Sequence, residues 1–249
     1  MNILVNGAGG FIESHLYNNL KDKYNFTRIF SSNHSLSGKQ CCSVDLTKIT
    51  KVENLAQDLS NANIEIVIHL ASRTASPNNI GDTTIFKDNI SITENMALLI
   101  KKLRPQLLIH FSSMAVYPNV SGCYSEESLS MPQENNDCLY GLSKFSSEVL
   151  LDFSLKNEDI RIVHLRVGQV YGEGMRQDRI IPVMRKELEE RNTITVYGNG
   201  ERQSCFIEIG KLVETVDCFI KNKFDGVFNV GDENKSYVNL AKTVIEQFG

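Results

Sequence analysis

Short apolar runs alternate with amphipathic stretches over most of this sequence. The apolar runs span residues 3–6, 28–30, 64–70, 107–112 and 160–165. Between them, apolar side chains recur with the period of a helix, most clearly over residues 11–20 and 83–103. Parallel strands need a crossover connection, usually a helix. The alternation therefore predicts an α/β fold in which helices cover both faces of a parallel sheet.

The regular alternation loosens after Arg166, where five glycines break the chain into loops: Gly168, Gly172, Gly174, Gly198 and Gly200. We expect residues 1–167 to form one domain. Residues 168–249 are expected to form a second, smaller α/β lobe, from which the 206–221 segment returns to the first domain. The expected elements of this second part are a helix over 209–221, a strand over 226–230 and a helix over 237–248.

Composition narrows the class of protein. The 249 residues carry a formal charge of -4 with a pI near 5.8, which gives no electrostatic footprint for nucleic acid or an anionic membrane. The chain starts without a charged leader and has no apolar run long enough to span a bilayer, so we expect a cytoplasmic protein. The six cysteines form no C-x-x-C pair and predict free thiols, with neither a disulfide framework nor a metal site.

A glycine-rich turn follows the first expected strand. Gly7 and Gly10 precede Phe11 and Ile12, which open the first helix. Backbone N–H groups and the helix dipole at such a place can hold the pyrophosphate of a dinucleotide, although a plain tight turn is the alternative interpretation. Glu13 takes the place of the third glycine in the G-x-x-G-x-x-G spacing. Because its bulk and charge lie near the expected pyrophosphate, we expect Glu13 to weaken cofactor binding and Glu13→Gly to tighten it.

The second expected strand lacks the acid that normally holds the adenosine ribose hydroxyls. It ends in Phe30-Ser31-Ser32-Asn33-His34, without Asp or Glu. Since no carboxylate there repels a 2′-phosphate, the sequence predicts either NAD or NADP as the cofactor.

Tyr140 and Lys144 lie one turn apart on one side of a predicted helix. The pKa of a tyrosine must fall by roughly three units before the phenol acts as a base near neutral pH, and a neighbouring ammonium favours that change. For this pair alone, a buried tyrosine beside a solvated lysine is the alternative. The apolar face of the same helix consists of Leu139, Leu142, Phe145 and Val149.

The strand before this helix ends in two hydroxyls, Ser112 and Ser113, at the carboxyl edge of the sheet where ligands bind. Tandem serines are also common in loops. A glycine turn, a strand-end serine and a Tyr/Lys pair in this order nevertheless favour an active site. We expect Ser113 to bond a substrate oxygen while Tyr140 moves the proton.

Motifs over nearly the whole chain resemble one family. They are GAGGFIESHL at 7–16, VDL at 44–46, IHLAS at 68–72, FSSMAVYP at 111–118, YGLSK at 140–144, LRVGQVYGEG at 165–174, YGNGERQSCF at 197–206 and VFNVG at 227–231. In this order they resemble the extended short-chain dehydrogenases/reductases of the NAD-dependent epimerase/dehydratase family. The resemblance implies a Rossmann-like doubly wound parallel sheet with a smaller substrate lobe. Family members generally continue beyond the length of this chain, so the lobe is expected to be incomplete at its C-terminus.

The resemblance also implies residue roles. Tyr140 would be the catalytic acid/base, Lys144 would lower its pKa and hold the nicotinamide ribose, and Ser113 would bind the reacting oxygen. The pair Asp45 and Leu46 would meet the adenine. The residues expected to bind the cofactor are Gly7, Gly10, Phe11, Ile12, Ser32, Asp45, Leu46, Leu70, Ala71, Ser72, Asn89, Ser112, Tyr140 and Lys144. Asn89 is either part of the support behind the site or a buried, merely satisfied amide.

The two residues that follow Ser113 narrow the range of possible reactions. Family dehydratases have Asp-Glu there for water loss, and enzymes that isomerise neighbouring carbons have a reactive cysteine, whereas this chain has Met114 and Ala115. What remains is a 4-epimerase or a 4-ketosugar reductase acting on a nucleotide-sugar. Pro118, where epimerases often have glycine, leans slightly towards the reductases.

The residues expected to bind the substrate diphosphate differ from those usual in the family. The usual arginine is Ser204 here, with Arg202 two residues earlier. We expect Ser113, Arg202 and Ser204 to bind substrate, with Arg176 or Arg179 as alternative cations, unless all three arginines are solvated surface charges. A homodimer formed through helices on one side of the sheet is a family expectation.

A non-catalytic dinucleotide sensor or scaffold is the competing hypothesis. Glu13, Ser204 and the short carboxyl end motivate it. The intact Ser113, Tyr140 and Lys144 argue against it, because a protein that only binds has no need of a proton relay.

Overall fold

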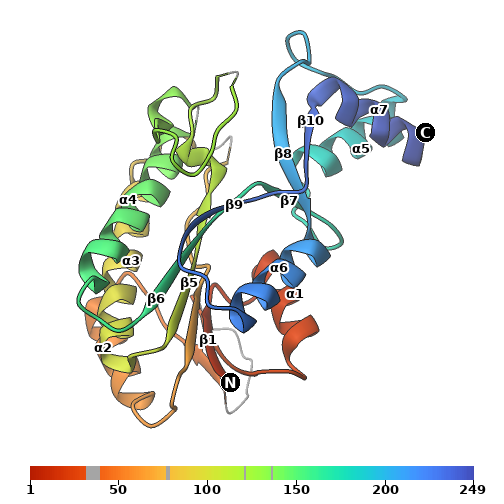
Figure 1. Ribbon diagram of the computed structural model, residues 1–249. Helices are drawn as coiled ribbons and strands as arrows, with labels where there is room; N and C mark the ends of the chain where they lie inside the picture. Colours follow the sequence, from red (N-terminus) through yellow and green to blue (C-terminus); the bar gives the residue numbers. More distant parts are fainter. Residues whose placement is uncertain (32–39, 77–78, 121, 136) are drawn as a thin grey trace.

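Seven strands form the main sheet of the computed structural model, which describes residues 1–31, 40–76, 79–120, 122–135 and 137–249 (Figure 1). Their order across the sheet is β3-β2-β1-β4-β5-β6-β9, and every neighbouring pair is parallel. The chain winds outwards from β1 and then returns to start the other half at β4, so the predicted doubly wound, Rossmann-like sheet is confirmed. The strands are β1 (Asn2–Asn6), β2 (Asn25–Phe30), β3 (Cys41–Ser43), β4 (Ile66–His69), β5 (Leu107–Ser113), β6 (Arg161–Val167) and β9 (Gly226–Val230).

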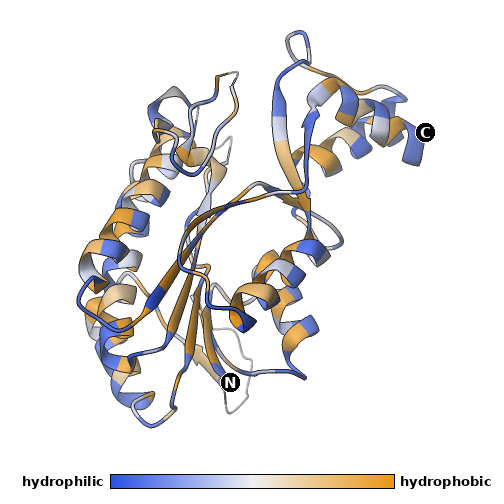
Figure 2. Cartoon of the chain, viewed as in Figure 1, coloured by the Kyte–Doolittle hydropathy of each residue, from blue (hydrophilic) through white to orange (hydrophobic). Residues whose placement is uncertain are grey.

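Helices cover both faces of this sheet (Figure 1). One face carries α1 (Phe11–Leu20) and α6 (Ile209–Lys221), and the other carries α2 (Ile49–Asp58), α3 (Thr84–Leu103) and α4 (Cys138–Leu155). Figure 2 shows hydrophobic strands between helices that have a hydrophobic and a hydrophilic side. Strands buried on both faces are expected to be apolar throughout, which is why their sequences read as continuous apolar runs.

A smaller lobe stands at the carboxyl ends of the strands (Figure 1). Its three-stranded sheet has the order β10-β8-β7 and packs against α5 and α7. Its elements are β7 (Gln169–Tyr171), α5 (Ile180–Arg191), β8 (Gln203–Glu208), β10 (Glu233–Ser236) and α7 (Tyr237–Phe248). Helix α6 packs with α1 and the main core, and β9 pairs with β6. The domain boundary near residue 168 stays a prediction.

Helix α4 buries a polar face. The apolar face predicted for it does not pack on the sheet, because Leu142 and Val149 are 40% and 53% exposed. Small and charged side chains face inwards instead: Ser143, Ser147, Lys144 and Glu148. They fit there because α3 supplies partners: Asn89 donates to Ser143 Oγ at 2.9 Å, and the hydroxyls of Thr93 and Ser147 are 2.7 Å apart.

An ion pair fills the place where the third glycine of the turn would let α1 approach the sheet. Glu13 is 1% exposed and binds Arg28 of β2 through two contacts, Nε to Oε1 at 2.6 Å and Nη2 to Oε2 at 2.8 Å. Its Oε2 also accepts from the N–H of Gly9 at 2.9 Å. The Arg28 guanidinium lies 4.0 Å from the centre of the Tyr17 ring. The charge of Glu13 is thus compensated from β2, and its effect on cofactor binding stays a prediction.

Removing Arg28 should destabilise the protein strongly. Arg28→Met leaves the Glu13 carboxylate buried without its counter-charge, which costs about 3–5 kcal/mol. The matched control is Arg185→Met, which breaks a pair with Glu189 in which both side chains are 53% exposed. Such surface pairs contribute about 1 kcal/mol or less. Urea unfolding of both variants measures the difference, and equal stabilities would contradict the structural role of the Glu13–Arg28 pair.

Candidate active site

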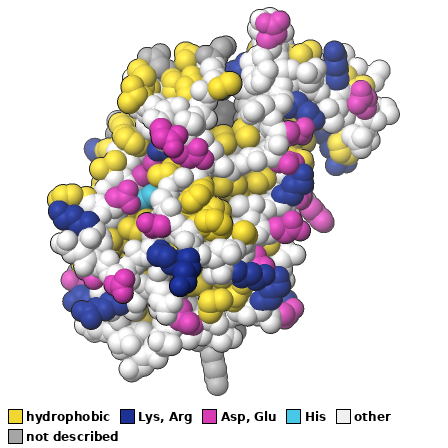
Figure 3. Space-filling model, viewed as in Figure 1, with side chains coloured by type: hydrophobic (Ala, Val, Ile, Leu, Met, Phe, Trp, Pro, Cys, Tyr) yellow, Lys and Arg dark blue, Asp and Glu magenta, His cyan; other side chains and the backbone are white. Residues whose placement is uncertain are grey.

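A cleft of about 1100 Å³ opens between the main sheet and the smaller lobe, at the carboxyl ends of the strands. Figure 3 shows the hollow between the two lobes, with hydrophobic side chains gathered below it. Many of the residues predicted to bind cofactor or substrate line it: Gly7, Gly10, Phe11, Ile12, Leu70, Ala71, Ser72, Ser113, Tyr140, Arg202 and Ser204. Segments far apart in the sequence thus meet at one surface.

The glycine turn is shaped by its close approach to β4. Gly7 has a φ of +74°, and a Cβ there would lie 3.1 Å from the backbone nitrogen of Ala71. Helix α1 begins directly after Gly10 without a side chain that caps it. The first N–H groups of a helix have no partner within the helix, so this end can hold an anion.

Asn6, the last residue of β1, fixes the opposite wall of the cleft. Its side-chain oxygen accepts from the N–H groups of Leu70 and Ala71, each at 2.7 Å. Its side-chain nitrogen lies 2.9 Å from Nδ1 of His69. Asn6 is 1% exposed, and no role was predicted for it from the sequence. The wall predicted to lie along the cofactor is therefore tied directly to the strand that precedes the glycine turn.

Tyr140 is held in its protonated form. Its pKa is raised to about 12, chiefly by burial and then by the carboxylate of Asp137, whereas a hydrogen bond with Ser113 and the charge of Arg179 act in the opposite direction. The pKa is thus raised in this structure, and the lowering predicted from Lys144 together with an oxidised nicotinamide stays a prediction. At neutral pH this phenol is a proton donor.

Lys144 lies below the cleft and is 5% exposed. Its Nζ donates to the carbonyl oxygen of Phe111 at 2.7 Å and is 5.9 Å from the centre of the Tyr140 ring. Burial lowers the pKa of Lys144 to about 8, while the negative charge of Glu148 raises it. At neutral pH the ammonium form therefore predominates beside the phenol.

The two strand-end serines have separate environments. Ser113 lines the cleft, and its Oγ accepts from the N–H of Ala115 at 3.1 Å at the start of the short 3-10 helix η1 (Met114–Val116). Ser112 is buried and donates to Glu148. The structure thus brings Ser113 to Tyr140 and turns Ser112 towards α4.

Other predicted cofactor residues lie outside the cleft lining. Asn89 is 3% exposed and supports the loop after β4, because its side chain accepts from the N–H of Arg73 at 2.7 Å and donates to the Arg73 carbonyl at 3.0 Å. Asp45 and Leu46 follow β3, where the Leu46 carbonyl accepts from Asn95 at 2.8 Å. Ser32 lies outside the described residues.

A buried ion pair behind the site was missed from the sequence. Glu148 accepts from Arg166 through Nη2 at 2.8 Å and Nε at 3.1 Å, and Arg166 Nη1 donates to the hydroxyl of Tyr117 at 2.8 Å. Tyr117 lines the cleft. The signal was present, because Glu148 continues the four-residue spacing of Tyr140 and Lys144 along α4.

Three arginines reach the cleft from the smaller lobe. Arg202 lies 5.6 Å from the centre of the Tyr237 ring, and Ser204 Oγ is 3.0 Å from the Tyr237 hydroxyl. Arg176 pairs with Asp178, and Arg179 acts on the pKa of Tyr140. All three expected cations therefore line the same cavity as the phenol.

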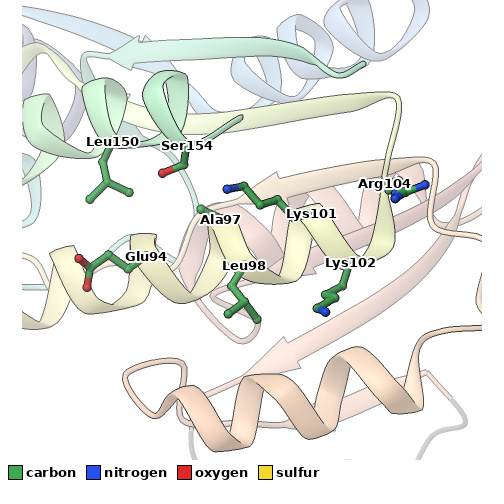
Figure 4. Close-up of a pocket in the computed structure, with 8 residues that line it drawn as sticks. All are labelled: Glu94, Ala97, Leu98, Lys101, Lys102, Arg104, Leu150 and Ser154. Atoms are coloured by element: carbon green, nitrogen blue, oxygen red, sulfur yellow. The ribbon is translucent and has the colours of Figure 1, made fainter. Parts of the chain in front are cut away.

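A second hollow lies on the outer side of α3 and α4, away from this cleft (Figure 4). It is lined by Glu94, Ala97, Leu98, Lys101, Lys102, Arg104, Leu150 and Ser154. Within the described part of the chain, no cluster of three or more His, Cys, Asp or Glu can hold a metal ion. Nor is any helix there long and apolar enough to cross a bilayer.

Known proteins resemble this chain in sequence. The dTDP-D-glucose 4,6-dehydratase of Dictyostelium discoideum is 25% identical, over 98% of this chain and 61% of that protein. The dTDP-4-dehydro-6-deoxyglucose reductase of Escherichia coli is 27% identical, over 78% of this chain and 62% of that protein. This chain therefore covers less than two thirds of the length of either relative.

The fold is shared with solved structures. The UDP-glucuronic acid 4-epimerase from Bacillus cereus, in complex with UDP-glucuronic acid and NAD, superposes with a TM-score of 0.82 at 27% identity, covering 99% of this chain and 82% of that chain. The family described as the NAD dependent epimerase/dehydratase family matches residues 3–231. With the glycine turn, the strand-end serine and the Tyr/Lys pair gathered around one cleft, this chain belongs to the NAD-dependent epimerase/dehydratase family.

Proposed function

We propose that this protein is an NAD- or NADP-dependent enzyme that acts on a sugar carbon of a nucleotide-sugar, as a 4-epimerase or a 4-ketosugar reductase. One observation carries the proposal: the glycine turn, Ser113 and Tyr140 line a single cleft, with the Lys144 ammonium directly behind it. The family and the names of its relatives support the nucleotide-sugar as substrate class. A protein that only senses a dinucleotide would not need the pair formed by Tyr140 at the cleft and the buried Lys144.

The residues of the cleft fit a dinucleotide. The uncapped start of α1, with Phe11 and Ile12, would hold the pyrophosphate, and the backbone of Leu70 and Ala71 would form the wall beside it. When bound, NAD or NADP would supply or accept the hydride at the sugar carbon. NAD and NADP remain alternatives, because β2 contains no carboxylate that could bind the hydroxyls of the adenosine ribose.

Proton transfer is the task of three side chains. Ser113 would hold the oxygen of the reacting sugar carbon by a hydrogen bond. Tyr140, protonated at neutral pH, would donate its proton to that oxygen during reduction. The ammonium of Lys144 would stabilise the phenolate that remains. In the oxidation half of an epimerisation, the phenolate would take the proton back.

The residues next to Ser113 support a reaction at one carbon. Met114 and Ala115 belong to η1 and line the cleft. Neither side chain can carry a proton, which a dehydration at this position requires. A 4-epimerase or a ketone reductase needs no further acid or base beyond Tyr140.

Tyr140→Phe should abolish turnover while leaving binding intact. The phenyl ring fills the same space but has no proton to donate, so kcat should fall by roughly 10²- to 10⁴-fold. The assay incubates the purified protein with a panel of UDP- and dTDP-sugars and their 4-keto derivatives, and follows cofactor absorbance and sugar products. Cofactor affinity, measured by titration calorimetry, serves as the control and should change far less than kcat, because the ring is retained. Firm cofactor binding by the wild-type protein without turnover of any sugar would favour the sensor instead.

The activity should fall as the pH rises through about 8. The ammonium form of Lys144 predominates below its pKa of about 8 and is lost above it. Since only the ammonium stabilises the phenolate, kcat should drop roughly tenfold per pH unit well above that value. Lys144→Met should be nearly inactive at every pH. Lys156→Met, which removes an exposed lysine at the end of the same helix, should keep the wild-type profile; an unchanged rate up to pH 10 would contradict the role of Lys144.

The outer face of α4 supports a homodimer. Leu142, Val149 and Phe153 are exposed there, Phe153 to 70%. Exposed apolar side chains of this size gathered on one face are typical of protein interfaces. Phe153→Asp should therefore give a monomer in sedimentation velocity experiments. Phe248→Asp, at an exposed site on the smaller lobe, should leave the assembly unchanged, and a monomeric wild-type protein would overturn this proposal.

A further inference from the structure

Three histidines form a row across the main sheet beneath the active site. His69 on β4, His110 on β5 and His164 on β6 are register partners, and each is at most 2% exposed. Their ring centres lie 5.3 Å apart between His69 and His110, and 5.1 Å apart between His110 and His164. None of them takes part in the chemistry proposed above, although buried polar side chains are costly unless they have partners.

The row is connected to solvent at one end. His110 Nδ1 lies 2.9 Å from Nδ1 of His164, and His164 Nε2 lies 3.0 Å from Oδ1 of Asp152. The Asp152 side chain is 57% exposed and projects from α4, two turns after Lys144. Asp152 is thus the surface end of a hydrogen-bonded chain that leads into the protein.

The carboxylate sets the tautomers along this chain. An ionised carboxylate only accepts, so Nε2 of His164 carries the hydrogen. In a neutral ring Nδ1 of His164 is then an acceptor, and His110 must donate from its own Nδ1. Burial holds the pKa of His110 well below its usual value, so this ring is neutral and its Nε2 carries no hydrogen.

Lys144 lies beside the inner end of the chain. Its ammonium binds the carbonyl of Phe111, the residue that follows His110, and its charge acts on both His110 and His69. We propose that Asp152, acting through His164 and His110, stabilises the ammonium form of Lys144 and so keeps it charged for the proton transfer at Tyr140. The inference rests on the proposed function, and these three residues are positioning residues that do not touch the substrate.

The physical basis is the alignment of dipoles. With the tautomers fixed as above, both imidazoles point their hydrogen-bearing side towards Asp152 and their lone-pair side inwards, and hydrogen bonds in such chains polarise one another. The orientation resembles the support that carboxylates give to metal-bound histidines, where an outer partner fixes the tautomer and raises the basicity of the ring. Here the inner charge is an ammonium.

Other charged and titratable groups pack against the same layer. Glu148 lies one turn from Lys144 on α4 and is already paired with Arg166 of β6. His69 on β4 is neutral, with a pKa lowered to about 3, and binds Asn6. Any effect of Asp152 must therefore be separated from the larger effect of Glu148.

The first test reads the tautomers directly. In ¹⁵N NMR spectra of the wild-type chain, His164 should carry its hydrogen on Nε2 and His110 on Nδ1. Single His→Gln variants assign the signals. In Asp152→Ala the preference should weaken at both rings. A wild-type His110 with its hydrogen on Nε2 would overturn the proposal. This measurement needs no substrate, so it stands or fails independently of the proposed function.

The second test follows the charge of Lys144. Its pKa, measured by NMR of the labelled lysine side chain, should fall by about half a unit in Asp152→Ala, which lowers the ammonium fraction about twofold at pH 8. The alkaline limb of the kcat profile should shift equally. Asp159→Ala removes one exposed negative charge just beyond α4 and controls for net charge. Equal pKa values in the two variants would overturn the proposal.

A double-mutant cycle separates the chain from a direct effect of charge. In a His164→Gln background, Asp152→Ala should no longer change the pKa of Lys144, because the connection is already broken. A shift as large as in the wild-type background would mean that Asp152 acts through space, which contradicts the proposed route. If the NMR shifts occur in a protein that turns over no sugar, the proposed function fails while the influence of Asp152 on Lys144 stands.

Discussion

The contact of α4 with the sheet is the constraint on which the rest of the site depends. Tyr140, Lys144, Glu148 and Asp152 follow one another at four-residue spacing, so they lie along one side of the helix. Lys144 and Glu148 are buried. A buried charge costs several kcal/mol unless it is paired and hydrogen-bonded, so the strands beneath must offer partners. The strands offer hydrogen-bond partners from both their backbone and their side chains. These bonds fix the position of α4 above β5.

The same requirement shapes the cofactor end of the cleft. Where the family pattern has a third glycine, the chain buries Glu13 and places Arg28 opposite it on β2. The carboxylate also binds the N–H of Gly9 within the turn itself. A glycine lets α1 pack on the sheet because it has no side chain, whereas here a buried ion pair fills the space between them. The ion pair also makes the glycine turn depend on Arg28 of the next strand.

Periodicity predicted the elements but not their polar partners. Helices α1, α6 and α7 have the expected bounds, because each combines a clear apolar period with a turn signal. The three-residue strand β3 and the helices α2 and α5 were not predicted, since a short strand carries no period and α5 contains a proline among charged residues. For α4 the visible apolar period marks the outer face, and the inner face is polar.

The active-site residues could be predicted from the sequence, but their ionisation states could not. Spacing along the helix is a property of the sequence, so the Tyr140–Lys144 pair and its strand-end serine could be named. Burial and distant charges depend on the tertiary structure, and they decide the ionisation state. Thus the sequence did not indicate that burial of the Tyr140 ring and the carboxylate of Asp137 raise its pKa in this structure. Glu148 could have been named from its four-residue spacing to Lys144, but its pairing with Arg166 of β6 is a property of the fold.

The two shifted pKa values together favour one direction of proton transfer. With the pKa of Tyr140 near 12 and that of Lys144 near 8, the resting pair holds a proton on the phenol and a positive charge behind it at neutral pH. This is the state required to give a proton to a developing alkoxide, that is, to reduce a ketone. To accept a proton, the phenol must first be deprotonated, and a further positive charge beside the ring would favour that. Oxidised nicotinamide would carry such a charge, so the redox state of the cofactor and the protonation state of Tyr140 would change together. The Tyr140–Lys144 pair would then need no other switch between the two half-reactions of an epimerase.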